Sequence, residues 1–161
     1  MSTLGERVSS ILIELADCLC QEITKREMPT PCFCGVLPGD DPPLIYCNAC
    51  EGGQAWVRLV GVGEPAGDIS IPTNVCAGII IVQIEMGMIH GYTGMTDEGE
   101  GVDMSTALAA TERQIDEMDA MYHVLTCCSL SMREKVSALS YVPLLDGGCL
   151  GGIWTGVVPV I

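Results

Sequence analysis

The sequence predicts an α+β fold: a mainly antiparallel sheet with two long helices packed on one face. Two stretches, 4–23 and 104–126, carry apolar residues at the three- and four-residue spacing of amphipathic helices. Segments of strand composition follow one another along the chain, and strands adjacent in sequence usually pair with each other. With 161 residues and no internal repeat, the chain is expected to form one domain, 1–161.

Charge and hydropathy argue against two classes of protein. The chain has 21 acidic and 7 basic residues, a net charge of −14, so it lacks the Lys/Arg surface that nucleic-acid binding requires. Its longest apolar run, residues 77–82, is too short to span a bilayer, and its beginning lacks the pattern of a secretory signal. We therefore expect a soluble protein that is made in the cytoplasm and has no membrane partner.

The first helix is predicted over residues 4–23. Its apolar stripe comprises Leu4, Val8, Ile11, Leu12, Leu15, Leu19 and Ile23. Ser2 or Thr3 can cap this helix, and Glu6 lies three residues after Thr3, as in a capping box. Pro29 ends the segment, because the residue before a proline is disfavoured in helical conformation.

A connector rich in proline, glycine and cysteine follows at residues 29–54. Its five prolines disfavour regular structure, and only residues 44–47 have the composition of a short strand. A connector of this length in a compact domain is usually functional or cross-linked. We therefore expect it to be stapled to itself or to the sheet.

Two strands are predicted after the connector. In the first, 54–62, alternation places Trp56 and Arg58 on one face and Ala55 and Val57 on the other. The second strand is predicted over residues 76–90. Its expected core face comprises Ile80, Val82, Ile84, Met86 and Met88.

The second long helix, 104–126, is predicted to begin at Ser105 as its cap. Its apolar stripe, which should face the core, comprises Leu108, Thr111, Ile115, Met118, Tyr122 and Leu125. A shorter helix is expected over residues 131–139. The chain then ends in a hairpin with arms near 141–145 and 152–160.

No set of catalytic residues stands out, and the protein is predicted not to be an enzyme. His90 and His123 lie in unrelated places, and the sequence contains neither G-x-S-x-G nor a Gly-Lys-Ser phosphate loop. The acidic residues cluster in two runs that are interpreted as solvated faces rather than acid–base pairs: Asp97, Glu98, Glu100 and Asp103, and Asp116, Glu117 and Asp119.

The ten cysteines are the one clear group of residues with a chemical role. Four of them, Cys32, Cys34, Cys47 and Cys50, have roughly zinc-ribbon spacing, so a zinc site is one interpretation. The other cysteines belong to no metal motif, and disulfides explain the whole set more economically. The candidates for disulfides or free thiols are Cys32, Cys34, Cys47, Cys50, Cys76, Cys127, Cys128 and Cys149.

Two further expectations concern individual cysteines. Cys149 can tie the final hairpin to Cys127 or Cys128 at the end of the second helix. Cys18 and Cys20 are two residues apart on the first helix and cannot both face the core, so one of them is expected to be a buried free thiol.

The order of elements and three short stretches carry a resemblance to a known family. The stretches are PCFCGVLPG from residue 31, YCNAC with GGQAWVRL from residue 46, and DGGCLGGIWTGVVPV from residue 146. They resemble head-to-tail connector proteins of phages that infect actinobacteria, and the layout is similar to the tail terminator proteins of long-tailed, siphovirus-type bacteriophages.

The resemblance implies a structural virion protein at the head–tail junction, without catalytic residues or cofactors. Tail terminators form a hexameric ring that caps the tail tube and joins it to the stopper or connector under the head. DNA passes through such a ring without specific binding, and an acidic wall repels it. The acidic loop 91–101, with Asp97, Glu98 and Glu100, is the candidate element facing the lumen or the tube.

Two alternatives remain open from the sequence. The chain can be the head-tail stopper or another protein of the same junction. From a different class, it can be a small zinc-binding accessory domain built around Cys32, Cys34, Cys47 and Cys50.

Overall fold

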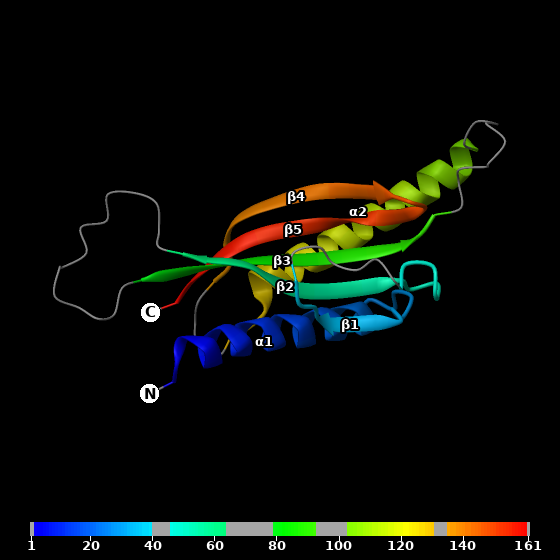
Figure 1. The fold of residues 1–161 in the computed structure, drawn as a ribbon. Coiled ribbons are helices and arrows are strands. Elements are labelled where there is room, and N and C mark those ends of the chain that lie inside the picture. Colours follow the sequence, from blue (N-terminus) through cyan, green and yellow to red (C-terminus); the bar gives the residue numbers. More distant parts are fainter. Residues whose placement is uncertain (1, 40–45, 64–78, 93–102, 131–134, 161) are drawn as a thin grey trace.

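A computed structural model describes residues 2–39, 46–63, 79–92, 103–130 and 135–160 (Figure 1). The elements along the chain are α1 (Leu4–Lys25), β1 (Phe33–Val36), β2 (Gln54–Gly63), β3 (Ile80–Gly91), α2 (Met104–Cys127), β4 (Ser137–Asp146) and β5 (Cys149–Val160). The strands form one mixed sheet in the order β1-β2-β3-β5-β4. β1 and β2 pair in parallel, and the other neighbours pair antiparallel, so the predicted α+β class is confirmed.

Both helices pack on the same face of the sheet, as predicted. α1 lies along β1 and β2, whereas α2 passes behind β3 and β5 in the view of Figure 1. The buried residues of α1 join one hydrophobic core with Val57 of β2, Ile84 and Met86 of β3, and Met121 of α2. The predicted stripe of α1 is confirmed from Val8 to Ile23, and Thr3 with Glu6 forms the expected capping box.

α2 packs on the sheet with a different face from the one that its apolar spacing predicts. Its buried residues are Glu117, Ala120, Met121, Val124 and Leu125. Of the predicted core stripe only Leu125 is buried, whereas Leu108, Thr111, Ile115 and Tyr122 are exposed. The prediction was wrong because Gln114 and Glu117 find polar partners in the sheet, so the polar side of the helix can face inward. The N-cap is Asp103, not Ser105.

The connector covers the opposite face of the sheet, where a second hydrophobic cluster lies. The buried members of this cluster are Cys47, Trp56, Ile89 and Cys149, and the partly buried members include Phe33, Leu37, Leu144 and Ile153. Phe33 stacks on Tyr46 with ring centroids 5.9 Å apart. The described part of the connector therefore adds a third layer to a fold that the sequence predicted to have two.

Three predicted elements differ in the structure. The strand inside the connector is β1, not 44–47, of which residues 46 and 47 lie in a turn and 44 and 45 lie outside the described residues. Residues 137–139, predicted as helix, begin β4, because Ser137 pairs with Val157 of β5. The final hairpin is confirmed with longer arms than predicted. Neither described helix has the length and apolar character needed to cross a bilayer.

Candidate functional site

The cysteines that the structure describes form four disulfide bonds, which connect every layer of the fold. The bonds are Cys18–Cys128, Cys20–Cys34, Cys32–Cys50 and Cys47–Cys149. Cys18–Cys128 joins α1 to the end of α2, and Cys20–Cys34 joins α1 to β1. The expected buried free thiol at Cys18 or Cys20 is therefore wrong: the two side chains leave the helix in different directions and each finds a partner.

The pairing overturns the zinc interpretation. Cys32 bonds to Cys50, but Cys34 bonds to Cys20 and Cys47 bonds to Cys149, so the four sulfurs belong to three separate bridges. A tetrahedral zinc site needs all four thiolates at one point. Among the described residues no group of His, Cys, Asp and Glu is arranged to hold a metal ion.

The Cys47–Cys149 bridge fastens the connector to the tip of the final hairpin. It spans 102 residues of sequence, and both side chains are buried in the cluster around Trp56. The prediction that Cys149 pairs with Cys127 or Cys128 was wrong, because Cys149 lies at the start of β5 on the sheet face opposite the helices. This bridge therefore holds the connector against the outer face of the sheet.

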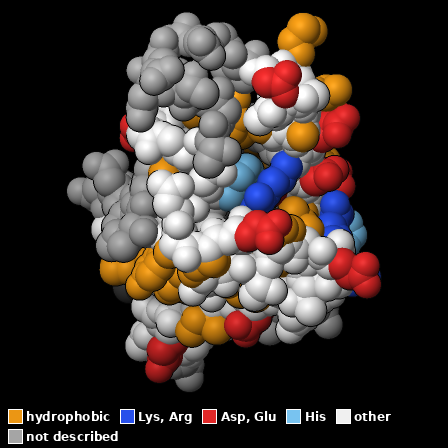
Figure 2. All heavy atoms as spheres, turned by 90° about the vertical axis from the view of Figure 1, so that its right-hand side faces the viewer, with side chains coloured by type: hydrophobic (Ala, Val, Ile, Leu, Met, Phe, Trp, Pro, Cys, Tyr) orange, Lys and Arg blue, Asp and Glu red, His pale blue; other side chains and the backbone are white. Residues whose placement is uncertain are grey.

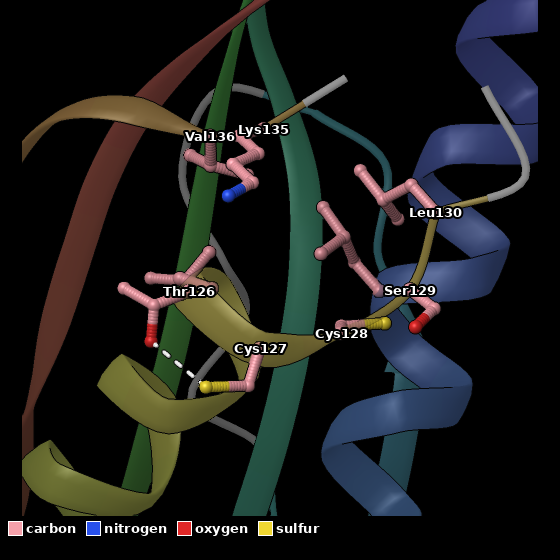
Figure 3. Close-up of a pocket in the computed structure, with 9 residues that line it drawn as sticks. Thr126, Cys127, Cys128, Ser129, Leu130, Lys135 and Val136 are labelled. Atoms are coloured by element: carbon pink, nitrogen blue, oxygen red, sulfur yellow. Dashed lines mark hydrogen bonds between the residues drawn. The ribbon is translucent and has the colours of Figure 1, made fainter. Parts of the chain in front are cut away.

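Cys127 and Cys128 are adjacent in sequence but point apart. In Figure 3 the Cys128 sulfur points towards α1, where it bonds to Cys18, whereas the Cys127 sulfur points towards Thr126. Cys127 is an exposed free thiol at the rim of a 360 Å³ hollow between the end of α2 and the chain ahead of β4. Lys135 and Val136 line the other side of this hollow.

A buried carboxylate organises the outer face of the sheet beneath the connector. Glu85 of β3 accepts hydrogen bonds from Trp56 Nε1 at 3.0 Å and from Arg58 Nε and Nη2 at 2.7 and 2.6 Å. Arg58 Nη1 also donates to the carbonyl oxygen of Gly39 at 2.9 Å. The indole of Trp56 lies directly over Gly87, where a Cβ atom would come within 2.2 Å of the ring. This network joins β2, β3 and the connector.

A second buried polar cluster joins α2 to the sheet. His90 Nδ1 of β3 lies 2.7 Å from Glu117 Oε1, and both side chains are almost fully buried. Arg113 Nε lies 3.1 Å from the same oxygen, and Arg113 Nη2 donates to the carbonyl of Glu51 in the connector at 2.6 Å. A carboxylate that orients an imidazole is a familiar catalytic element. Here its burial and its contact with three segments make it a structural link.

The other flank of α2 carries exposed charge. Arg26 of α1 pairs with Asp119 at 2.7 Å, and His123 Nδ1 lies 3.2 Å from Glu22 of α1. Figure 2 shows basic, histidine and acidic side chains gathered in one band on this side of the molecule. The expected solvated face is thus correct for Asp119, but Glu117 of the same acidic run is buried.

Tyr141 of β4 lies under the helix layer, and the charge of Glu117 in the His90–Glu117 cluster affects the pKa of its phenol. Burial, and then the nearby charge of Glu117, raise the pKa of its phenol to about 12. Because this folded pKa lies above the ordinary value near 10, Tyr141 stabilises the fold fully below about pH 10. That contribution is lost as the pH rises from about 10 to 12.

This gives a prediction for alkaline titration followed by tyrosinate absorbance. One of the four tyrosines is expected to titrate near pH 12, and its step should disappear in Tyr141→Phe. Tyr122→Phe is the matched control, because Tyr122 also contacts Trp154 but is exposed on α2. A late step that persists in Tyr141→Phe would contradict the assignment.

Cys76 and the acidic residues Asp97, Glu98 and Glu100 lie outside the described residues. The sequence patterns did not predict that Glu85, Arg58 and Glu117 are buried. One signal was available for Glu85, since it stands in the middle of a strand that is otherwise apolar.

No protein-family model matches the chain, and no curated protein matches it.

Proposed function

We propose that this chain is a structural subunit of a long-tailed bacteriophage, a tail terminator that forms a ring at the head-proximal end of the tail tube. The resemblance of three short stretches, beginning at residues 31, 46 and 146, supports this assignment. The ring is proposed to be a hexamer that contacts the tail tube protein on one side and the stopper or connector protein on the other.

The observation that carries the proposal is the disulfide set. Four bonds, two of which close loops of more than 100 residues, tie both helices, the sheet and the connector into one cross-linked unit. Disulfides persist in oxidising surroundings and are rare in proteins that work in the cytoplasm. A virion protein spends its working life outside the cell, where such cross-links resist unfolding.

Charge supports the same role. A net charge of −14 repels the DNA that passes through a ring of such subunits. Under this proposal Asp97, Glu98 and Glu100 face the lumen or the tail tube. No catalytic residue is assigned, because the buried His90–Glu117 pair serves to link α2 to the sheet.

The location of the chain in the particle tests the proposal. Antibodies against the purified protein, detected with gold in electron micrographs of purified virions, are expected to label the junction of head and tail. Label at the distal tail tip or on the capsid, or the absence of the chain from virions by mass spectrometry, would overturn it.

A further inference from the structure

In the part of the chain that the structure describes, the sheet has an open edge on each side. β4 forms one edge, and β1 with β2 forms the other, at the opposite side of the molecule in Figure 1. β1 pairs only with Gln54–Val57, so among the described residues no strand borders residues 59–63 of β2 on that side. Open edges present unpaired backbone donors and acceptors that can pair with another chain.

One open edge continues into an apolar surface on the helix layer. α2 packs against β5 and β3 and meets β4 near Tyr141, whereas the helix side of β4 beyond Tyr141, at Pro143 and Leu145, is exposed and leaves a gap in the described helix layer. The flank of α2 that faces this gap carries its exposed apolar side chains, and Tyr122 there contacts Trp154 of β5. We call this the β4 surface; it comprises Met104, Leu108, Ile115, Tyr122, Pro143 and Leu145.

The opposite edge has an apolar surface on the same layer. Val36, Leu59 and Val62 pair with residues whose side chains enter the helix-side core, so they point to the helix side as well. A groove of 550 Å³ lies here between β2 and residues 36–39. We call this the β2 surface; it comprises Ile13, Val36, Leu59, Val60 and Val62.

We infer that the β4 surface of one copy of this chain binds the β2 surface of the next copy, head to tail, in the ring of the proposed function. The strand directions fit this contact. β2 is antiparallel to β3, β3 to β5 and β5 to β4, so β4 runs antiparallel to β2. A neighbour related by simple rotation therefore places its β2 antiparallel to β4, and one sheet continues from copy to copy.

The helix layer becomes continuous in the same arrangement. α1 lies beneath β1 and β2, and its outer flank exposes Ile13. When β2 of the next copy lies beside β4, the α1 of that copy occupies the gap beneath β4 and faces the apolar flank of α2. The rotation that relates one copy to the next thus covers large apolar side chains on both copies.

Charge and size favour a second copy as the occupant. A chain with net charge −14 repels its own kind, so a contact between copies is favoured where acidic side chains are few. Residues 59–63 carry no charge, and β4 carries only Asp146, at its end. The ten residues of β4 with the exposed flank of the 24-residue α2 come close to the roughly 20 residues per partner of a standard interface.

A mixing experiment with purified full-length protein tests the contact. Ile115→Glu disables the β4 surface and Val62→Glu disables the β2 surface, and each adds a carboxylate at an exposed position that leaves the core intact. Sedimentation velocity, up to on the order of 1 mM protein, is expected to show wild-type oligomers larger than dimers. Each variant alone should self-associate at least about tenfold more weakly.

A mixture of the Ile115→Glu and Val62→Glu variants tests whether the contact joins unlike surfaces. A contact between unlike surfaces leaves one good surface on each variant, so equal amounts should form a 1:1 dimer and nothing larger. Ala109→Glu, which adds the same charge on the α1-facing flank of α2, should assemble as the wild type does. Strong dimers of Val62→Glu alone would show a contact of the β4 surface with itself and overturn the inference. A wild-type chain that stays monomeric, or variants that assemble fully, would overturn it too.

The inference rests on the proposed function only in placing the contact within a ring. If head-to-tail assembly is found but the chain is absent from virions, the proposed function fails and the contact stands. If the chain is found at the head–tail junction but the variants assemble as the wild type does, the contact fails alone. Circular dichroism melting of each variant confirms that a lost interaction is not a lost fold.

Discussion

Replacing Cys47 and Cys149 together by alanine is expected to lower the free energy of unfolding by about 4–5 kcal/mol. The bridge closes a loop of 102 residues, and the entropy that it removes from the unfolded chain grows with loop length. Its sulfurs are also buried beside Trp56 and Ile89, so the connector loses its attachment to the outer face of the sheet. Urea unfolding followed by tryptophan fluorescence measures the loss.

Two matched variants sharpen this prediction. Cys32→Ala with Cys50→Ala removes a bridge across 18 residues and should cost less, about 3 kcal/mol. Cys127→Ala removes an exposed free thiol and should change stability by no more than about 0.5 kcal/mol. The pairing described here is contradicted if Cys127→Ala costs as much as either double variant, or if the Cys47–Cys149 variant is as stable as the wild type.

The second large effect is expected from Glu85→Ala. The change leaves Arg58 buried without its bidentate partner and Trp56 Nε1 without its acceptor, which should cost about 3–5 kcal/mol. The same urea titration measures it. The emission maximum of Trp56 fluorescence is also expected to shift in the folded state, because the indole loses the carboxylate next to its nitrogen.

The control for this prediction replaces both charges. Arg58→Met with Glu85→Leu removes the pair without leaving an uncompensated charge, and buried pairs replaced in this way often cost little. We therefore expect the double variant to be clearly more stable than Glu85→Ala. A double variant that is the less stable of the two would show that the ion pair itself, not the orphaned charge, holds the connector to the sheet.

The sequence predicted the fold where the deciding signals are local. The start of α1 follows from Thr3 and Glu6, whose reciprocal hydrogen bonds need no tertiary contact. The alternation in β2 correctly separated Trp56 from Ala55 and Val57, because neighbouring residues of a strand must face opposite sides. The class of the fold and most strands followed from these patterns.

The packing of α2 could not be predicted from its apolar spacing. Periodicity assumes that the more apolar side of a helix is buried, yet Glu117 is buried against His90 and the Trp154 indole donates to the carbonyl of Met118. These partners come from β3 and β5, far away in sequence. The apolar side left exposed, around Leu108 and Ile115, is the side that the inferred contact between copies would cover.

The disulfide pairing also could not be predicted from the sequence. Their spacing grouped Cys32, Cys34, Cys47 and Cys50 as one site. In the fold, however, Cys34 bonds to α1 and Cys47 bonds to the final hairpin. Cysteine positions state how many bridges are possible, whereas the topology decides which sulfurs meet.

Deletion of the gene for this chain from the phage genome is the most direct test of the proposed function. A tail terminator sets where tube growth stops and joins the tube to the head. Electron micrographs of the deletion lysate should therefore show filled heads beside unattached tails of irregular, excessive length, and the wild-type gene supplied in trans should restore normal particles. Tails of normal length beside leaking heads would indicate a stopper instead, and normal virions would contradict a structural role at the junction.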